Sequence, residues 1–326
     1  MARELYDVLV IGGCAAGLTA AIYARRKELT VAVISPETGG ATALSNWIEN
    51  YPGSPPMAGL KLMEQFRTSA QQLGTEVVLS RVTAIETGET FTLTLDDRTW
   101  RRGRTLIVTS GKIPRRLNVP GENRFFGRGV STCATCDGPL FKGKVVAVVG
   151  GGNAAVEAAL ELGAIARHVS LIHRRDRFRA DEVTVAKLQR TGVERILNSE
   201  VIAVMGKPHL TGVRGRHAGG KVTTLPLQGV FLEIGADTDA ALLSPVFAHN
   251  AQNEIIVDDR QRTSVRGAFA AGDVTNVAFK QTVISAGDGA TAALEAHRFL
   301  TLPGYQWLPP AGQLLNVPIR PKKGGI

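Results

Sequence analysis

The sequence predicts an α/β chain with two doubly wound domains, because one pattern of strand, glycine turn, helix and strand occurs twice along it. The chain has 326 residues, enough for two ordinary domains with hydrophobic cores. Its apolar content of 44% and charged content of 21% are close to the averages for globular domains. The composition therefore predicts a folded chain rather than a disordered or repetitive one.

The first copy of the pattern begins near the N-terminus. The apolar run over residues 6–11 is short and β-branched, which is typical of a buried strand. Gly12 and Gly13 form the turn, an Ala- and Leu-rich helix is predicted over 15–25, and a second strand over 29–34. A glycine turn between the first strand and the helix of a βαβ unit is typical of a dinucleotide-binding domain.

The second copy lies in the middle of the chain. A strand is predicted over residues 144–149, a turn over 150–152, a helix over 153–162 and a further strand over 168–173. The two copies are roughly 140 residues apart, so we expect two Rossmann-like domains, an architecture suited to two dinucleotides.

The remaining segments are predicted more coarsely. The second domain is expected to end near residues 235–241, and residues 114–120 to cross between the domains. Strands are expected over 76–79, 91–95, 104–108 and 267–273, a helix over 284–300, and an irregular tail rich in Pro and Gly over 301–326.

The net charge of +9 can favour nucleic acid, anionic membranes or acidic protein partners. The basic residues cluster over 101–104 and 174–179, and Phe178 is the one aromatic residue within these ranges, so we expect no nucleic-acid partner. We expect no membrane partner either, because no uninterrupted apolar stretch could span a bilayer. Three cysteines are too few for a disulfide-stapled secreted scaffold, and the N-terminus shows no signal for export, so we expect a reducing, cytoplasmic compartment.

The second glycine turn matches the dinucleotide fingerprint as Gly150-x-Gly152-x-x-Ala155. The first glycine permits the turn, the second lets the backbone approach a pyrophosphate, and the small third residue allows close helix–strand packing. An acidic residue for the ribose 2′-hydroxyl of NAD is expected after the next strand, but here residues 173–179 read HRRDRFR. Guanidinium groups at this place suit a 2′-phosphate, so NADPH is expected rather than NADH.

The first glycine turn is less regular, because Cys14 takes the place of the second fingerprint glycine between Gly12 and Gly17. A side chain there must point away from the pyrophosphate or push it outward. We expect Cys14 to be a packed turn residue rather than a reactive thiol.

Cys133 and Cys136 form a Cys-x-x-Cys pair, which can be structural, half of a zinc site, or a redox-active dithiol. A zinc site needs a second pair of ligands at suitable spacing. Cys14 lies in the other domain's turn, and His168 and His173 belong to a nucleotide-binding strand, so no metal is expected. Asp137 follows the second cysteine and could move a proton as thiolates form and leave.

Over nearly all of residues 5–300 the chain resembles the low-molecular-weight, bacterial-type thioredoxin reductase family. The Cys-x-x-Cys motif embedded in the second nucleotide-binding domain is highly specific to that family. The segments that carry the resemblance are NYPG (50–53), VPGE (119–122), GRGVSTCATCDG (127–138), GGGNAAVE (150–157), HRRDRFRA (173–180), FAAGDV (269–274) and KQ (280–281).

The resemblance implies two cofactors held by two domains, the second inserted into the first. FAD would lie in the domain formed by residues 1–115 and 243–300, and NADPH in residues 116–242, with 301–326 as a C-terminal tail. The residues expected at FAD are Gly12, Gly13, Ala15, Ala16, Gly17, Glu37, Gly40, Ala41, Asn50, Val82, Gly111, Gly272, Asp273, Lys280 and Gln281. Those expected at NADPH are Gly150, Gly152, Asn153, Ala154, Ala155, His173, Arg174, Arg175 and Arg179.

The resemblance also implies a route for electrons. They would pass from NADPH to the flavin, then to Cys133–Cys136, and then by thiol exchange to a thioredoxin-like partner. By the family's order Cys136 is the flavin-proximal sulfur, Cys133 attacks the disulfide of the partner, and Asp137 is the acid–base residue. Members of the family are homodimers, so a homodimer is expected.

Four features depart from the family's pattern: Cys14, Ala41 in place of a flavin-contacting Gln, the turn Ser110-Gly111-Lys112, and a C-terminal extension of some 25 residues. The extension contains Tyr305 and Trp307. They could belong to an ordered strap packed on the surface or across a dimer, or one ring could stack on the flavin.

Three functions are therefore open. The first is a thioredoxin-disulfide reductase supplied by NADPH. The second is a related flavin disulfide reductase that takes electrons from ferredoxin or another donor because the tail obstructs the access of NADPH. The third is a non-enzymatic flavoprotein that senses redox state. The intact set Arg174, Arg175 and Arg179 favours NADPH.

Overall fold

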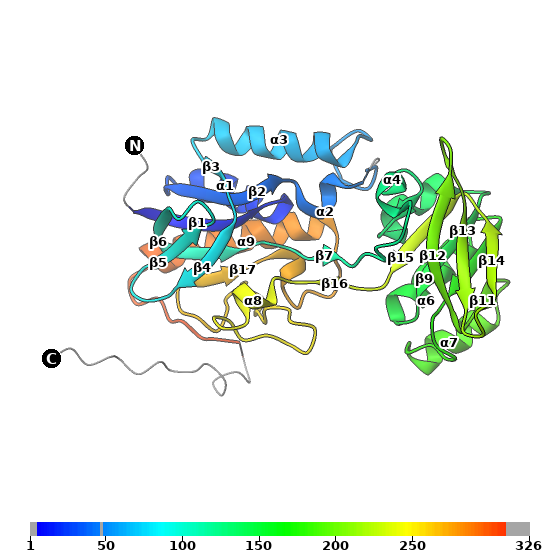
Figure 1. Cartoon of the computed structure of the whole chain (residues 1–326). Coiled ribbons are helices and arrows are strands. Elements are labelled where there is room, and N and C mark those ends of the chain that lie inside the picture. Colours follow the sequence, from blue (N-terminus) through cyan, green and yellow to red (C-terminus); the bar gives the residue numbers. More distant parts are fainter. Residues whose placement is uncertain (1–4, 46–47, 311–326) are drawn as a thin grey trace. The chain divides into compact units, whose positions relative to one another are not determined.

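The computed structural model describes residues 5–45 and 48–310 (Figure 1). The chain forms two compact units. Unit 1 contains residues 1–43, 60–112 and 237–326, and unit 2 contains residues 44–59 and 113–236. Both units have an α/β architecture, so the predicted fold class is confirmed.

Unit 1 is built on a seven-stranded sheet in which β3, β2, β1 and β6 run parallel, and β17 continues the parallel part beside the C-terminal half of β6. The N-terminal half of β6 pairs instead with β5, and β5 with β4, both antiparallel. The strands are β1 (Tyr6–Gly13), β2 (Val31–Thr38), β3 (Glu76–Leu79), β4 (Val82–Glu86), β5 (Phe91–Leu95), β6 (Trp100–Val108) and β17 (Ala268–Ala270).

Along the central strand β1 of unit 1, successive side chains face two different hydrophobic cores in turn. Leu9 and Ile11 of β1 face a cluster with β5 and α8, whereas Val8 and Val10 face a cluster with α1 and α9. This period of two is expected of a central strand that is covered on both faces. The helices of unit 1 are α1 (Ala15–Arg25), α2 (Gly40–Ala43), α3 (Gly59–Gln72), α8 (Ala240–Leu243), the short 3-10 helix η2 (Gly272–Val274) and α9 (Thr282–Thr301).

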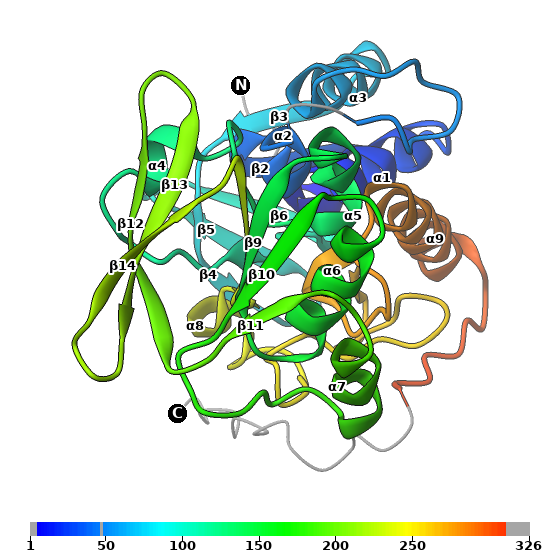
Figure 2. The ribbon, with the colours of Figure 1, turned by 90° about the vertical axis from the view of Figure 1, so that its right-hand side faces the viewer.

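Unit 2 contains a five-stranded parallel sheet of order β11-β10-β9-β15-β8 and a separate antiparallel sheet of β12, β13 and β14 (Figure 2). Its helices α5, α6 and α7 pack on one face of the parallel sheet, and the antiparallel sheet packs on the other. The strands are β8 (Val130–Ser131), β9 (Val145–Gly150), β10 (His168–Ile172), β11 (Glu194–Ile196), β12 (Ser199–Gly206), β13 (Leu210–His217), β14 (Val222–Pro226) and β15 (Gly229–Glu233).

The helices of unit 2 are α4 (Glu122–Phe125), α5 (Ala134–Asp137), the 3-10 helix η1 (Gly138–Phe141), α6 (Asn153–Gly163) and α7 (Glu182–Gln189). Two short strands, β7 (Ile113–Pro114) and β16 (Ala236–Asp237), pair where the chain passes between the units. These two strands lie near the crossings expected over 114–120 and 235–241, which stay a prediction.

The main difference from the expected boundaries is the segment 44–59, which we expected within the N-terminal domain but which clusters with unit 2. One contact that joins this segment to the rest of unit 2 is the hydrogen bond from the Ser45 hydroxyl to Asp137, at 3.0 Å. The strand expected over 104–108 is also longer, because its polar half from Trp100 pairs with β5.

Candidate redox site and nucleotide-binding turns

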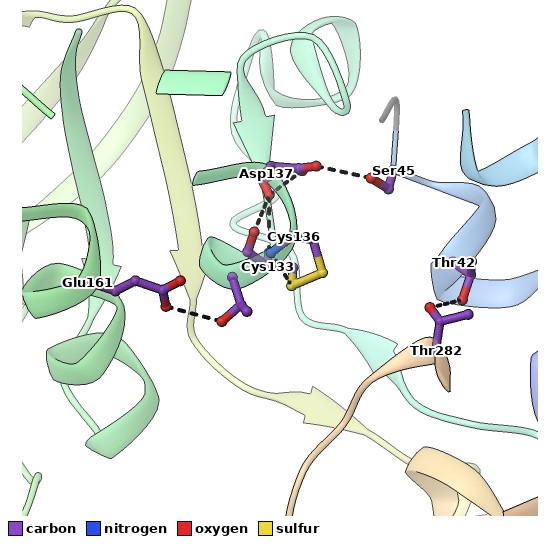
Figure 3. The surroundings of a disulfide bond; sticks show 9 residues. Thr42, Ser45, Cys133, Cys136, Asp137, Glu161 and Thr282 are labelled. Carbon is purple, nitrogen blue, oxygen red and sulfur yellow. Dashed lines mark hydrogen bonds between the residues drawn. A yellow bond between two sulfur atoms is a disulfide. The ribbon is translucent and has the colours of Figure 1, made fainter. Parts of the chain in front are cut away.

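Cys133 and Cys136 form a disulfide in unit 2, with their Cα atoms 5.3 Å apart (Figure 3). The two cysteines lie at the start of α5, one before the helix and one within it. Cys133 is the residue before the helix, and its Sγ accepts the backbone N–H of Cys136 at 3.2 Å. The predicted redox pair is thus placed as a disulfide at a helix start, with a hydrogen bond to one of its sulfurs.

The Asp137 carboxylate lies beside this disulfide and is held by two hydroxyl groups (Figure 3). Ser131 donates to one oxygen at 2.7 Å, and Ser45 donates to the other at 3.0 Å. The backbone N–H of Asp137 donates to the carbonyl of Cys133 at 3.1 Å. These contacts fix the Asp137 carboxylate in the same helical turn as the sulfurs, and its acid–base role stays a prediction.

Sequence reasoning missed a second carboxyl group at this site. Glu233 ends β15, and the backbone N–H of Ala134, between the two cysteines, acts to lower its pKa. Burial and the nearby charge of Glu161 raise the pKa of Glu233 to about 7. The available signal was an acidic residue at the carboxyl end of an apolar strand, GVFLE, in a parallel sheet.

The second glycine turn has the geometry that the fingerprint predicts. A Cβ on Gly150 would lie 2.3 Å from the carbonyl oxygen of Glu233 and 2.6 Å from the Cβ of Ala155, so no larger residue fits there. A Cβ on Gly152 would meet nothing within 4 Å. The open space lies at the start of α6, where backbone N–H groups are left without helical partners. This cradle fits a phosphate group.

The basic segment after β10 lies beside that turn. The backbone N–H of Arg179 donates to the carbonyl of Gly151 at 2.6 Å, while the side chains of Arg174 and Arg175 are exposed. His173 is buried against the turn, and its Nε2 has no hydrogen-bond partner among the described residues. Burial, with help from Arg179 and Arg175, lowers the pKa of His173, so the ring is neutral at pH 7.

Asn153 and Asp181 close the other side of the same turn. The Asn153 side chain donates to the Asp181 carboxylate and accepts the backbone N–H of Asp181, both at 2.8 Å. Ala154 and Ala155 follow in the first turn of α6. The predicted NADPH residues are therefore brought together in unit 2, with Asn153 engaged in a protein contact.

The first glycine turn, in unit 1, follows the same rule. A Cβ on Gly12 would lie 2.4 Å from the carbonyl oxygen of Thr109, and one on Gly17 would lie 1.9 Å from that of Gly12. Cys14 precedes α1, and its Sγ lies 3.0 Å from the carbonyl oxygen of Thr109. Burial raises the pKa of the Cys14 thiol. The side chain is thus packed in the turn and protonated at pH 7, which matches the expectation of a turn residue.

The returning segment brings a charged cluster to unit 1. Lys280 donates to the carbonyl of Thr275 at 2.6 Å and pairs with Glu254 at 3.1 Å, and Lys112 pairs with the same Glu254 oxygen at 2.7 Å. Burial raises the pKa of Asp273, which accepts a hydrogen bond from Ser285 at 3.1 Å. Glu254 was missed by sequence reasoning, because nothing near it in the sequence indicates its two lysine partners.

The other residues expected at FAD are not all in one unit. Gly13 lies beside Glu37, since β1 pairs with β2 there, and Gly40 and Ala41 begin α2. Ala15 and Ala16 are buried in α1, Val82 is buried at the start of β4, and Gly111 and Gln281 are partly buried in unit 1. Asn50 belongs to the segment that clusters with unit 2.

Tyr305 and Trp307 pack on unit 1 beside the C-terminal end of α9. The Trp307 ring makes edge contacts with Phe269 at 5.2 Å and Phe299 at 5.6 Å, and the Tyr305 hydroxyl donates to Glu295 at 2.6 Å. In this arrangement the segment after α9 forms an ordered strap packed on the surface of unit 1. The stacking of either ring on a flavin stays a prediction that this placement does not favour, and residues 311–326 lie outside the described residues.

Two further observations bear on other classes of function. Residues 5–45 and 48–310 hold no group of three or more His, Cys, Asp or Glu side chains suited to a metal ion. None of the helices in these ranges is both long and apolar enough to cross a bilayer.

Comparison with known proteins places this geometry in a family. The family model for pyridine nucleotide-disulphide oxidoreductases matches residues 6–290. The crystal structure of thioredoxin reductase from Streptococcus pyogenes is similar, with a TM-score of 0.87 and 34% sequence identity over 92% of this chain and 99% of that one.

Two curated relatives are similar in sequence. The F component of alkyl hydroperoxide reductase from Xanthomonas campestris pv. phaseoli is 40% identical over 302 residues, covering 90% of this chain and 57% of the relative. The bifunctional thioredoxin reductase/thioredoxin of Mycobacterium leprae is 38% identical over 305 residues, covering 91% of this chain and 66% of the relative. The chain thus spans only 57–66% of the length of these two relatives.

The thioredoxin reductases of this family are flavoproteins that use FAD and NADPH. The resemblance seen in the sequence is confirmed by the family match and by the structural likeness. With a Rossmann-type fold and a Cys133–Cys136 disulfide, this oxidoreductase chain belongs to the pyridine nucleotide-disulphide oxidoreductase family.

Proposed function

We propose that this chain is a thioredoxin-disulfide reductase, in which electrons pass from NADPH through FAD and the Cys133–Cys136 pair to a thioredoxin-like protein. The observation that carries the proposal is the disulfide at α5 with the Asp137 carboxylate fixed beside it. Such a pair can be reduced to a thiol and a thiolate and can then exchange with a partner disulfide.

We assign FAD to unit 1 and NADPH to unit 2. The Gly12 and Gly17 turn and the returning segment with Asp273 would hold FAD, whose isoalloxazine ring supplies two-electron transfer when bound. The open cradle at Gly152 would receive the pyrophosphate of NADPH. The exposed guanidinium groups of Arg174 and Arg175 would bind its 2′-phosphate.

The residues of the redox turn have separate tasks in this proposal. Cys136 is the sulfur that receives electrons from the flavin, and Cys133 attacks the disulfide of the partner. Asp137, oriented by Ser131 and Ser45, gives a proton to the departing thiolate and takes one back. We also propose a homodimer as the assembly, as the resemblance implies.

Anaerobic titration with NADPH, followed by addition of oxidised thioredoxin, tests the proposal. The flavin absorbance should fall with NADPH and return when thioredoxin is added, with the appearance of thioredoxin thiols. A flavin that stays oxidised with NADPH but is reduced by ferredoxin would replace this proposal with the alternative donor.

Two variants sharpen the test. Cys133→Ser should keep FAD and its reduction by NADPH but lose the reduction of thioredoxin. A variant that still reduced thioredoxin would contradict the assigned roles. Loss of a charge-assisted hydrogen bond costs about 1.5–3 kcal/mol, so Arg174→Ala should raise the KM for NADPH roughly 10–100-fold and leave that for NADH unchanged.

A second candidate function is favoured by the 40% identity with the F component of alkyl hydroperoxide reductase. In this case the reduced pair would transfer electrons to a disulfide of a peroxidase partner. Turnover with thioredoxin and with a purified peroxidase partner, measured side by side at equal concentrations, decides between the two. The function as a redox sensor without turnover is rejected if either substrate is reduced.

A further inference from the structure

The basic segment after β10 is held against the glycine turn of α6 by several contacts. The backbone N–H of Arg179 donates to the carbonyl of Gly151 at 2.6 Å. The His173 ring lies directly against Gly151, because a Cβ on this glycine would be 2.2 Å from the ring. The Phe178 ring lies beside the same imidazole, with the two ring centroids 5.6 Å apart. Residues 173–179 therefore have a fixed place beside the turn.

Asp181 and Asn153 extend this attachment with two hydrogen bonds. The Asn153 amide donates to the Asp181 carboxylate, and its carbonyl oxygen accepts the backbone N–H of Asp181, both at 2.8 Å. Asn153 is the first residue of α6 and follows Gly152, where the cradle for a phosphate group is open. This pair, the Asn153–Asp181 clamp, thus joins the end of the basic segment to the start of the cradle.

The Asp181 carboxylate does not cap its own helix. Asp181 directly precedes α7, and an Asp at that position ordinarily accepts a backbone N–H from the first turn of the helix. Here the side chain makes no such bond to α7 (Glu182–Gln189) and is bonded to Asn153 instead. The chain therefore forgoes the stabilisation of a cap and has a contact between the two nucleotide-binding segments in its place.

Between these fixed points the charged side chains of the segment reach into solvent. Arg174, Arg175, Asp176 and Arg177 are all exposed. Their backbone is also held from the β12 side, where the N–H of Asn198 donates to the carbonyl of Arg175 at 3.0 Å. A loop that is ordered before a ligand arrives loses less conformational entropy on binding, so its guanidinium groups can bind a phosphate more tightly.

We propose that Asp181, acting through Asn153, is a positioning residue that sets the preference for nucleotides with a 2′-phosphate over those without one. The inference rests on the proposed function, because it takes the arginines of this loop as the 2′-phosphate site. The clamp holds the loop at a fixed distance from the phosphate cradle. A nucleotide with both a pyrophosphate and a 2′-phosphate finds both sites in place, whereas one without the 2′-phosphate uses only the cradle and does not depend on the clamp.

Isothermal titration calorimetry of the oxidised holoenzyme with NADP⁺ and with NAD⁺ tests this inference without turnover. Asp181→Ala should weaken the binding of NADP⁺ about tenfold and that of NAD⁺ by less than about twofold. A general loss of structure in unit 2 would weaken both nucleotides by the same factor, so the ratio of the two affinities isolates positioning. Equal losses for both nucleotides, or no loss for either, overturn the proposal.

A double-mutant cycle tests whether the two residues act as one device. Asn153→Ala removes both hydrogen bonds without a change of charge and should weaken NADP⁺ about as much as Asp181→Ala does. The double variant should then bind NADP⁺ no more weakly than either single variant, because the clamp is already open in each. Losses that multiply in the double variant mean that the two side chains act separately on the nucleotide, and they refute the clamp.

Two further variants separate the contact from the charge. Asp181→Asn is the conservative variant, which keeps an oxygen that can accept the Asn153 amide but removes the negative charge. Glu182→Gln removes a charge from the next residue, whose side chain is exposed. Both variants should bind NADP⁺ at least as tightly as wild type, because each removes an anion near a phosphate and leaves the clamp in place. A loss of about tenfold in either variant would contradict the proposal.

A measurement on wild type alone covers the case in which the variants do not fold. Hydrogen exchange of the holoenzyme without nucleotide should show the hydrogen-bonded N–H groups of Arg179 and Asp181 protected at least about tenfold relative to an unstructured peptide. Exchange at the unprotected rate overturns the inference, because the loop would then not be ordered before the nucleotide binds.

The same titrations distinguish a failure of the proposed function from a failure of this inference. Wild type that binds NADP⁺ no more tightly than NAD⁺ overturns the assignment of NADPH and the inference with it. Wild type that prefers NADP⁺, together with an Asp181→Ala variant of the same preference, overturns the inference alone.

Discussion

Replacing Trp307 by alanine tests whether the segment after α9 is a structural strap of unit 1. The indole ring makes edge contacts with Phe269 at 5.2 Å and Phe299 at 5.6 Å, and it packs on the core cluster between the sheet, α1 and α9. The change removes both edge contacts, and with them a tilted contact with Tyr305 at 6.4 Å, and leaves the chain otherwise intact. It therefore measures how much the strap stabilises the unit.

The magnitude follows from these contacts. Each aromatic pair contributes about 0.5–1.5 kcal/mol beyond burial, so the two pairs together contribute about 1–3 kcal/mol. The partial burial of the ring adds to this, while the buried indole N–H, which has no hydrogen-bond partner among the described residues, offsets part of it. We expect the free energy of unfolding of unit 1 to fall by about 2–3 kcal/mol.

Thermal unfolding, followed by circular dichroism and by flavin absorbance in the same sample, is the assay. For domains of about 150–250 residues each kcal/mol shifts Tm by about 2–4 °C, so the variant should melt about 4–12 °C lower. Leu308→Ala, at a side chain 59% exposed, is the control and should change Tm by less than about 1 °C.

Two results would refute this reasoning. A Trp307→Ala variant with the wild-type Tm would show that the strap does not stabilise unit 1. An unchanged Tm together with a shifted flavin spectrum would favour the alternative in which an aromatic ring of the tail contacts the flavin.

Two further predictions concern the charged cluster and the open turn. Glu254→Gln should leave Lys112 and Lys280 without their shared anion and lower the free energy of unfolding by about 2 kcal/mol, measured by guanidinium denaturation. Although burial raises the pKa of Glu254, hydrogen bonds chiefly from these lysines keep it below its ordinary 4.5, so the stabilisation is present above pH 4.5 and is lost as pH falls through the folded-state value. Equal denaturation midpoints for wild type and variant at pH 7 would contradict this. Gly152→Ala should keep the wild-type Tm but weaken NADPH binding at least about tenfold, because its Cβ enters the open cradle. Gly219→Ala, whose Cβ also meets nothing within 4 Å, is the control, and equal NADPH affinity in both variants would count against the cradle.

Much of the fold could be predicted from the sequence, because it depends on local patterns. The β-branched run before Gly12 and the one before Gly150 each end at a turn that only glycine can make, and the structure has both turns in place. The Cys-x-x-Cys motif indicates a possible redox pair, and its disulfide is present. In each case the partners are within a few residues, so the sequence alone brings them together.

The rest could not be predicted, because it depends on contacts between distant segments. Glu233 comes to lie opposite Gly150 only through the pairing of β15 with β9, and Glu254 contacts Lys112 across 142 residues. The polar half of β6 from Trp100 has no apolar alternation in its sequence, and its strand conformation follows from pairing with β5. A single sequence contains no signal for these pairings.

The discontinuity of unit 1 has a consequence for the synthesis of the chain. Strand β6 is completed on its second side by β17, and α1 is covered by α9, so the first nucleotide-binding turn lacks its cover until residues 268–301 have been made. Most of unit 2, residues 113–236, is continuous and can close as soon as it leaves the ribosome. During synthesis we therefore expect unit 2 to fold first, and the N-terminal strands of unit 1 to complete their packing only after residues 268–301 have been made.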